Sequence, residues 1–293
     1  MQESQMPLVE AEGRSLYAES FGDPSDPALL LISVMTSQLT SWPEFFCEAL
    51  VDRGFFVIRF DNRDVGLSTN FVDREQYSLS DMADDCVEVL RHFDAAPAHV
   101  MGMSMGGMIA QILAIEHPEV MLSMISYASC TADPDTGKPT EEAVLALLQP
   151  APTTRAEAEV AGVEGKRVWG TPDTWDETEW AAFCGDNFDR AAPAAGSGLR
   201  QFMAVDQSGQ WDEPLAQIDV PTLVIHGSID PLINADGGRH TAKVIPDATY
   251  VEIEGMGHDL PITEWPHIVS LITNHAVQAA NGARGRALLD ETP

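Results

Sequence analysis

The chain has 293 residues, 44% of them hydrophobic, so it is long enough and apolar enough to bury a sizeable core. Its formal net charge is −30, from 46 acidic and 16 basic residues, and this balance disfavours nucleic acids and anionic membrane surfaces as partners. The four cysteines are scattered without a CxxC pair, which favours reduced thiols over a disulfide framework or a zinc site.

The sequence also gives an expectation for the cellular location of the protein. It contains no run of about 18 or more apolar residues, so no membrane-spanning helix is expected. Residues 1–20 show neither the basic nor the apolar segment of a secretory signal peptide, and we expect a cytoplasmic protein. The acidic excess has two interpretations: a surface kept soluble by self-repulsion, or an adaptation to salt.

The first half of the chain alternates between short apolar runs and amphipathic stretches. A hairpin is expected between residues 8 and 21, followed by a loop. Strands and helices then alternate, with strands predicted at 28–33, 55–60, 98–103 and 122–128 and helices at 42–54, 79–93 and 106–118. The helix at 79–93 carries a capping pattern around Ser80 and Asp81. This alternation predicts βαβ units and a parallel sheet.

The rhythm breaks between about residues 133 and 214, where no strand pattern is visible. This stretch is rich in Ala, Pro, Thr, Asp and Glu and holds four of the six tryptophans. Helices are predicted at 140–149 and 176–190. We expect a helical insertion that covers the substrate pocket, with some of its tryptophans and phenylalanines lining that pocket.

The strand pattern then resumes at residues 221–227 and 249–255. The expected organisation is therefore an α/β core interrupted once. The core comprises residues 1–134 and 216–293, and the helical cap insertion comprises residues 135–215.

The stretch GMSMGG, residues 102–107, follows a predicted strand and opens a predicted helix. A G-x-S-x-G pattern in this setting is typical of a nucleophile elbow, a turn so tight that only glycines fit beside the serine. Ser104 would present its hydroxyl above the sheet, and the backbone N–H of Met105 would face a developing oxyanion. The alternative is a glycine-rich turn in which Ser104 only caps the helix.

A serine nucleophile needs a base, and the base needs an orienting acid. Asp230 follows the strand PTLVIHG, and His258 follows the strand TYVEIEG. Both therefore fall at the carboxyl ends of parallel strands, the edge at which such sheets bind ligands. The strongest rivals are His226 as the base and Asp133 as the acid.

Five pieces of the sequence together resemble the α/β-hydrolase superfamily over nearly the whole chain: FGDPSDPALLLI, FDNRDVGLS, HVMGMSMGGMIAQ, PTLVIHGSIDP and GMGHDLP. Their combination resembles the aclacinomycin methylesterase type of bacterial esterase. The resemblance implies an α/β-hydrolase fold, with a mostly parallel central sheet, helices on both faces and a helical cap insertion. It implies Ser104 as nucleophile, Asp230 as acid and His258 as base. It also implies an oxyanion hole formed by the backbone N–H groups of Met35 and Met105.

One position departs from the superfamily pattern. After the third strand the superfamily usually shows His-Gly or Gly-Gly, whereas this chain reads SVM at residues 33–35. By position, the N–H of Met35 is the expected second donor of the oxyanion hole.

The expected activity is hydrolysis of a neutral, largely apolar carboxylic ester through an acyl-enzyme, with no metal or organic cofactor. The same triad also serves carbon–carbon bond hydrolases and cofactor-free perhydrolases, and some ligand receptors with this fold retain it. The expected partner is a small-molecule ester, without nucleic acid or membrane insertion. A homo-oligomer is compatible with the sequence.

Overall fold

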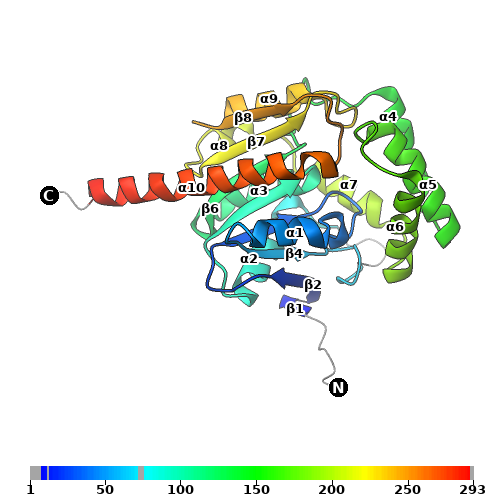
Figure 1. Cartoon of the computed structure of the whole chain (residues 1–293), viewed down its shortest axis with the longest axis horizontal. Coiled ribbons are helices and arrows are strands. Elements are labelled where there is room, and N and C mark those ends of the chain that lie inside the picture. Colours follow the sequence, from blue (N-terminus) through cyan, green and yellow to red (C-terminus); the bar gives the residue numbers. More distant parts are fainter. Residues whose placement is uncertain (1–7, 12, 72–75, 291–293) are drawn as a thin grey trace, which may run out of the picture.

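An eight-stranded sheet forms the centre of the protein (Figure 1). The computed structural model describes residues 8–11, 13–71 and 76–290, with side chains up to residue 281. The strand order is β1-β2-β4-β3-β5-β6-β7-β8. The β1–β2 and β2–β4 pairs are antiparallel, and every other pair of neighbours is parallel.

The elements follow the predicted alternation. The strands span Leu8–Ala11 (β1), Arg14–Phe21 (β2), Ala28–Ile32 (β3), Phe56–Phe60 (β4), Ala98–Met103 (β5), Met121–Tyr127 (β6), Thr222–Gly227 (β7) and Thr249–Ile253 (β8). The helices of the core span Glu44–Val51 (α1), Leu79–His92 (α2), Met105–Glu116 (α3), Ala235–Val244 (α9) and Trp265–Asp290 (α10). Between β6 and β7 lie Glu141–Leu147 (α4), Arg155–Trp169 (α5), Glu177–Arg190 (α6), Ser197–Gln207 (α7) and Asp212–Leu215 (α8).

Helices cover both faces of the sheet, as the alternation along β3 shows. Leu29 and Leu31 belong to an apolar cluster shared with α1 and α10, whereas Leu30 and Ile32 belong to a second cluster shared with α2, α3 and α8. A strand buried on both faces is a continuous apolar run in sequence, which is why ALLLI was recognisable. The predicted mostly parallel sheet with helices on both faces is confirmed.

The chain reverses its progress across the sheet at β3. From β3 it passes to β4 on one side, and then to β5 on the other side of β3. Such a switch point leaves a crevice at the carboxyl ends of the two strands whose connections diverge. The loop after β3 and the turn after β5, which holds Ser104, both begin there.

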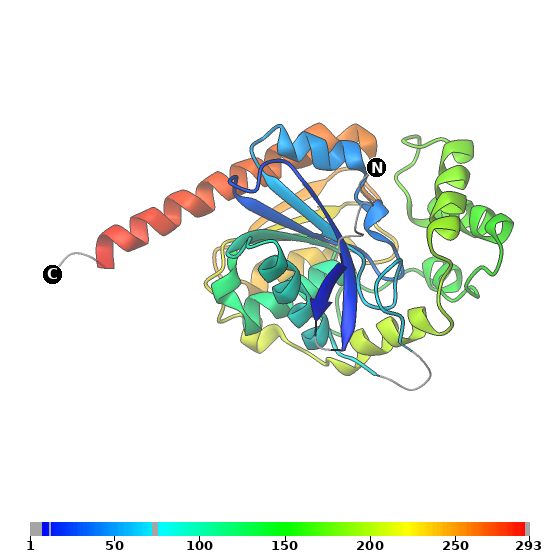
Figure 2. The same cartoon turned by 90° about the horizontal axis from the view of Figure 1, so that it is seen from below.

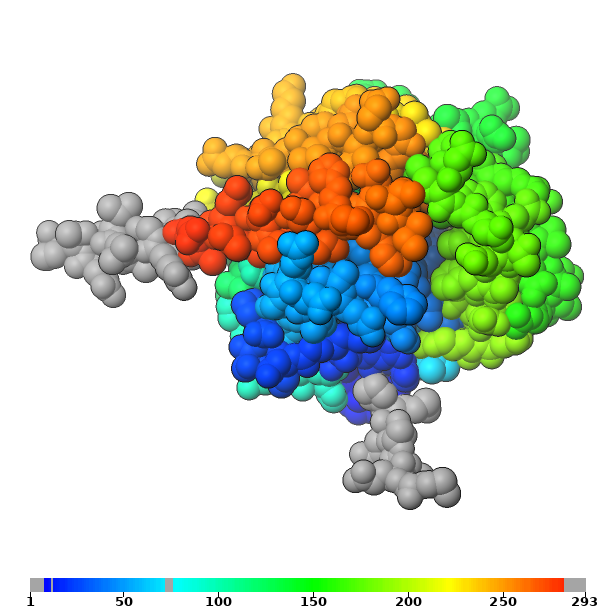
Figure 3. Space-filling model, in the orientation of Figure 1, coloured from blue at the N-terminus to red at the C-terminus, as the bar shows by residue number. Residues whose placement is uncertain are grey.

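The helices between β6 and β7 extend the molecule at one end. Figures 1 and 2 place α4, α5 and α6 together beyond the sheet, while the far end of α10 projects from the opposite end. The space-filling view shows this segment, in green, against the core (Figure 3). Of the four tryptophans in the stretch without strands, Trp211 packs in the core cluster beside α3, where its Nε1 donates a hydrogen bond of 2.8 Å to Gln111.

Two local predictions differ from the structure. The cap of α2 is Ser78, two residues before the predicted position: its hydroxyl accepts the N–H of Asp81 at 3.2 Å, and the Asp81 carboxylate accepts the N–H of Ser78 at 2.8 Å. Helices α5, α7 and α8 were not among the helices predicted between β6 and β7. Within the described ranges, no helix is both long and apolar enough to cross a membrane, as expected.

Candidate active site

Ser104 occupies the single residue between the end of β5 and the start of α3. Its backbone has φ 56° and ψ −120°, a left-handed conformation that side chains rarely adopt. A Cβ on Gly102 would lie 1.9 Å from the carbonyl oxygen of Gly106, and a Cβ on Gly106 would lie 2.2 Å from that of Ile32. The glycines of GMSMGG therefore allow the strand, the turn and the helix to approach closely.

The neighbouring strand fixes the backbone of this turn. The N–H of Ser104 donates a hydrogen bond of 2.9 Å to the carbonyl of Tyr127, the last residue of β6. The hydroxyl of Ser129 donates one of 2.7 Å to the carbonyl of Ser104. Because both backbone groups of Ser104 are bonded, the strained conformation is held by tertiary contacts.

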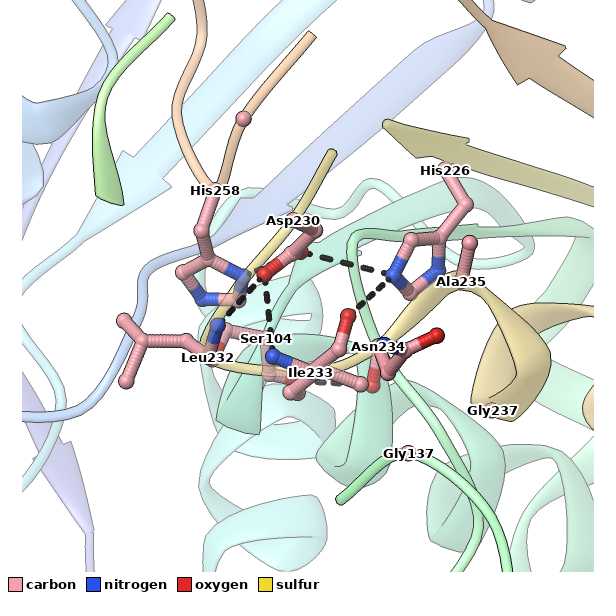
Figure 4. A network of polar contacts seen from close by, with 12 residues as sticks. Ser104, Gly137, His226, Asp230, Leu232, Ile233, Asn234, Ala235, Gly237 and His258 are labelled. Atoms are coloured by element: carbon pink, nitrogen blue, oxygen red, sulfur yellow. Dashed lines mark hydrogen bonds and ion pairs between the residues drawn. The ribbon is translucent and has the colours of Figure 1, made fainter. Parts of the chain in front are cut away.

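His258 and Asp230 are joined by a hydrogen bond of 2.6 Å between Nδ1 and Oδ2 (Figure 4). The carboxylate can only accept, so Nδ1 carries a proton, and in the neutral imidazole Nε2 is then the nitrogen with the free lone pair. The other oxygen of Asp230 accepts the backbone N–H groups of Leu232 and Ile233, each at 2.9 Å. The carboxylate is thereby held in one orientation, with its remaining oxygen aimed at the imidazole.

The charge of Asp230 is stabilised by its neighbours. Burial alone would raise the pKa of this carboxyl, but His258 and His226 outweigh burial and hold its pKa well below the usual range. Asp230 is therefore ionised at neutral pH, as an acid that orients a base must be.

The two rival residues occupy other places. His226 Nε2 donates to the carbonyl of Ile233 at 2.8 Å and lies 3.4 Å from Asp230 Oδ2, so its ring packs behind the acid. Asp133 lies 4.0 Å from His240. The structure thus brings His258 to Asp230, with the second histidine beside the same carboxylate.

The predicted oxyanion donors lie on the two loops that begin at the switch point. Within the described part of the chain, the N–H groups of Met35 and Met105 donate to no acceptor. The loop of Met35 is held from α7, because the N–H of the next residue, Thr36, donates 2.7 Å to Gln201. The amide nitrogen of Gln201 donates 3.0 Å to the carbonyl of Arg63. The loop of Met35 is thus bonded to helix α7, which lies between β6 and β7.

Residues 27–264 match the sequence model that describes the alpha/beta hydrolase fold. The chain belongs to this family. It is 31% identical to the rhodomycin D methylesterase DauP of Streptomyces sp. (strain C5), over 92% of this chain and 97% of DauP. It is also 31% identical to the rhodomycin D methylesterase DnrP of Streptomyces peucetius, over 89% of this chain and 94% of DnrP. The predicted resemblance to this type of hydrolase is confirmed.

Solved structures show the same fold. The crystal structure of the esterase RhEst1 from Rhodococcus sp. ECU1013 superimposes with a TM-score of 0.75 at 19% identity, covering 92% of this chain and 97% of RhEst1. The enol-lactonase from Burkholderia xenovorans LB400 gives a TM-score of 0.73 at 22% identity, covering 92% and 100%. At these identities the likeness concerns the fold, and the predicted α/β-hydrolase fold is confirmed.

Two aspartates of the FDNRDVGLS motif form ion pairs with helices that lie between β6 and β7. The Asp64 carboxylate binds Arg200 of α7 at 2.7 Å, and the Asp61 carboxylate binds Arg190 of α6 at 2.8 Å. Both aspartates are buried. The sequence alone did not assign a role to this motif, because its partners lie more than a hundred residues away along the chain.

One group of side chains in the described residues has the composition of a cation site. Atoms of Asp133, Asp212 and His240 lie within 4.8 Å of one another. His240 Nε2 is already bonded to Asp212 at 2.6 Å, and the side chains are partly exposed. None of the three contacts the Asp230–His258 pair, so the chemistry proposed below does not involve them.

Proposed function

We propose that this chain is a serine carboxylic ester hydrolase acting on neutral, largely apolar esters. The observation that carries the proposal is the His258–Asp230 hydrogen bond at the same sheet edge as the strained Ser104 turn. The comparisons establish the coarser level: the chain is an alpha/beta hydrolase whose relatives DauP and DnrP are named methylesterases, which are carboxylester hydrolases. The triad and the substrate are the proposal.

Each group has a defined part in the reaction. His258 Nε2 takes the proton of the Ser104 hydroxyl while Oγ bonds to the ester carbonyl carbon. The N–H groups of Met35 and Met105 stabilise the oxyanion. The bond to the alcohol oxygen breaks, and the alcohol leaves with the proton from His258. Water then attacks the acyl-enzyme, with His258 again acting as the base, and the acid is released.

The substrate class is inferred from charge and from the relatives. A chain with a net charge of −30 repels anionic substrates, which favours a neutral ester. The names of DauP and DnrP support ester cleavage, with a methyl ester as the first substrate to test. We propose that residues 135–215 form a cap over Ser104, since Gln201 already reaches the loop of Met35. We also propose a cytoplasmic location, in keeping with four unpaired cysteines.

The test is ester turnover by the wild type, Ser104→Ala and His258→Ala. A series of p-nitrophenyl esters from acetate to laurate, together with methyl esters of apolar acids, defines the acyl preference. Each variant should lose about a thousandfold or more in kcat with an unchanged circular dichroism spectrum. Activity retained by either variant, once contaminating esterase is excluded, contradicts the proposal.

A further inference from the structure

The loop that carries His258 is bonded to the end of helix α5. We call residues 166–171, which end α5 and follow it, the strap. The backbone N–H of His258 donates a hydrogen bond of 2.6 Å to the carbonyl of Trp169. The N–H of Gly257 donates one of 2.9 Å to the hydroxyl of Thr171. Two consecutive backbone groups of the loop are therefore fixed by the strap.

The residue after His258 completes this contact with its side chain. One carboxylate oxygen of Asp259 accepts the hydroxyl of Thr171 at 2.5 Å. The other accepts the N–H of Thr171 at 3.1 Å and the ammonium group of Lys166 at 2.6 Å. The carbonyl of Asp259 accepts the hydroxyl of Tyr127 at 2.7 Å. Asp259 thus joins the loop both to the strap and to β6.

The contact between the strap and the loop includes a buried ammonium group, that of Lys166. Of the chain's three lysines, Lys138 and Lys243 are exposed, whereas the side chain of Lys166 is 7% exposed. Its ammonium group lies 4.3 Å from the centre of the Trp180 ring. Burying an ion pair costs several kcal/mol of desolvation, which the mutual attraction only partly offsets. Such a pair is therefore weak evidence for stability and calls for another explanation.

The packing leaves the loop little freedom. A Cβ on Gly257 would lie 2.4 Å from the carbonyl oxygen of Trp169, so loop and strap touch backbone to backbone. The imidazole of His258 is restrained from its other side by Asp230. A shift of the loop would move the imidazole relative to Ser104, and a misplacement of about 1 Å can cost about a hundredfold in rate.

We propose that Thr171, Asp259 and Lys166 are positioning residues, through which the helical insertion sets the orientation of the general base. The inference rests on the proposed function, in which His258 is that base. It assigns the insertion a part in the chemical step that is separate from covering the substrate. A purely structural role, in which the strap only holds the insertion to the core, is the alternative that the experiment must distinguish.

The first arm removes the central hydroxyl. Thr171→Val deletes both the donor to Asp259 and the acceptor of the Gly257 N–H, whereas Thr171→Ser keeps them. The matched control is Thr222→Val, which removes another buried threonine hydroxyl. That hydroxyl donates a hydrogen bond of 2.9 Å to the carbonyl of Val220 and lies at the start of β7, whereas Asp230 follows the end of that strand. We expect Thr171→Val to lower kcat by about tenfold to a hundredfold with KM nearly unchanged. Thr171→Ser should restore kcat, and Thr222→Val should lower the melting temperature without lowering kcat.

The second arm removes the cation. Lys166→Met should lower kcat in the same way. Its control is Arg155→Met, at the other end of α5. Arg155 binds Glu159 of its own helix at 2.9 Å and joins α5 to α6 through Asp186, also at 2.9 Å, without touching the loop. If Arg155→Met and Thr222→Val lower kcat as much as the strap variants, or if Thr171→Val keeps wild-type kcat, the positioning role is wrong.

Failure of the inference can be told apart from failure of the proposed function. Ser104→Ala is assayed beside the strap variants on the same ester. If Ser104→Ala is inactive while Thr171→Val is fully active, the esterase proposal stands and the positioning role does not. If Ser104→Ala is active, the proposed function itself is wrong.

Discussion

At the scale of single residues, Asp230 is the side chain whose surroundings are most completely defined. It accepts two backbone N–H groups and the imidazole of His258, and its pKa lies below the usual range. Since an unfolded aspartate has a pKa of about 4, the ionised form stabilises the folded state above that pH. This contribution is lost only as the pH falls below about 4, so Asp230 keeps its charge wherever the enzyme is assayed.

We predict that Asp230→Asn lowers kcat by roughly ten-thousandfold, because an amide no longer enforces the tautomer that leaves Nε2 of His258 free. Asp133→Asn should remain close to wild type, since Asp133 has no contact with His258. The kcat of both variants is measured on one ester at one pH. The opposite result, with Asp133→Asn the damaging change, would mean that the acid has been assigned to the wrong residue.

At the scale of elements, the sequence predicted what is local and missed what is tertiary. The strands were recognisable as apolar runs, and the Ser104 turn as glycines in a strand–turn–helix setting. Helix α5 was missed because Gly162 and Gly165 weaken its helical pattern. Gly162 is required by packing: a Cβ there would lie 2.2 Å from Cys184 Sγ of α6. Such a requirement exists only once α6 is in place.

In the candidate site, too, the local features could be predicted from the sequence and the tertiary contacts could not. Asp230 and His258 could be predicted because each directly follows a strand, and parallel strands end at one edge. The bond between Lys166 and Asp259 could not, because nothing in either local sequence reports a partner 93 residues away. The cap of α2 was placed at Ser80, although Asp81 stands three residues after Ser78, the spacing of a capping box, whereas Ala83 stands three residues after Ser80. The side-chain bonds between Ser78 and Asp81 follow that spacing.

A histidine outside the candidate site, His99 of β5, also affects the pH dependence of stability. His99, near the start of β5, is buried, and its Nδ1 lies 2.8 Å from the hydroxyl of Ser123. Burial, with a smaller contribution from His275, lowers the pKa of His99 to about 4. Between about pH 6.5 and pH 4, the unfolded chain therefore binds a proton that the folded chain does not.

We predict that the free energy of unfolding falls as the pH is lowered through this interval, by on the order of 3 kcal/mol from His99. Urea unfolding between pH 7.5 and 4.5 measures it. His99→Gln should show a shallower dependence on pH, whereas His92→Gln, which replaces an exposed histidine, should match the wild type. Equal slopes for wild type and His99→Gln would show that this ring does not titrate as stated.

At the scale of the whole molecule, some of the few basic residues are held in internal ion pairs. Arg59, Arg63, Lys166 and Arg200 are all held in ion pairs with buried or part-buried carboxylates. Each of these four pairs is neutral, so the net charge of −30 is carried by the other 12 basic and 42 acidic residues, from totals of 16 and 46. The folded state therefore carries a self-repulsion that an expanded chain relieves.

Added sodium chloride should raise the melting temperature, most steeply at low ionic strength, because exposed charges more than about 10 Å apart are largely screened at roughly 0.1 M salt. Hydrolysis of a neutral ester should survive molar salt. A thermal melt series to about 1 M salt, with chloride and sulfate compared at equal ionic strength, separates screening from ion-exclusion effects. A melting temperature that stays flat or falls with chloride rules out repulsion as the cause.

The backbone of Ser104 has a consequence for how this protein changes under selection. Its left-handed conformation costs on the order of 1–3 kcal/mol for a residue with a side chain, and glycine adopts it without that cost. Stability and activity therefore oppose each other at this position. A library screened only for heat resistance will favour glycine at position 104, and a lineage that no longer needs the hydrolase will drift the same way. Any programme to stabilise the enzyme must therefore select for turnover in every round.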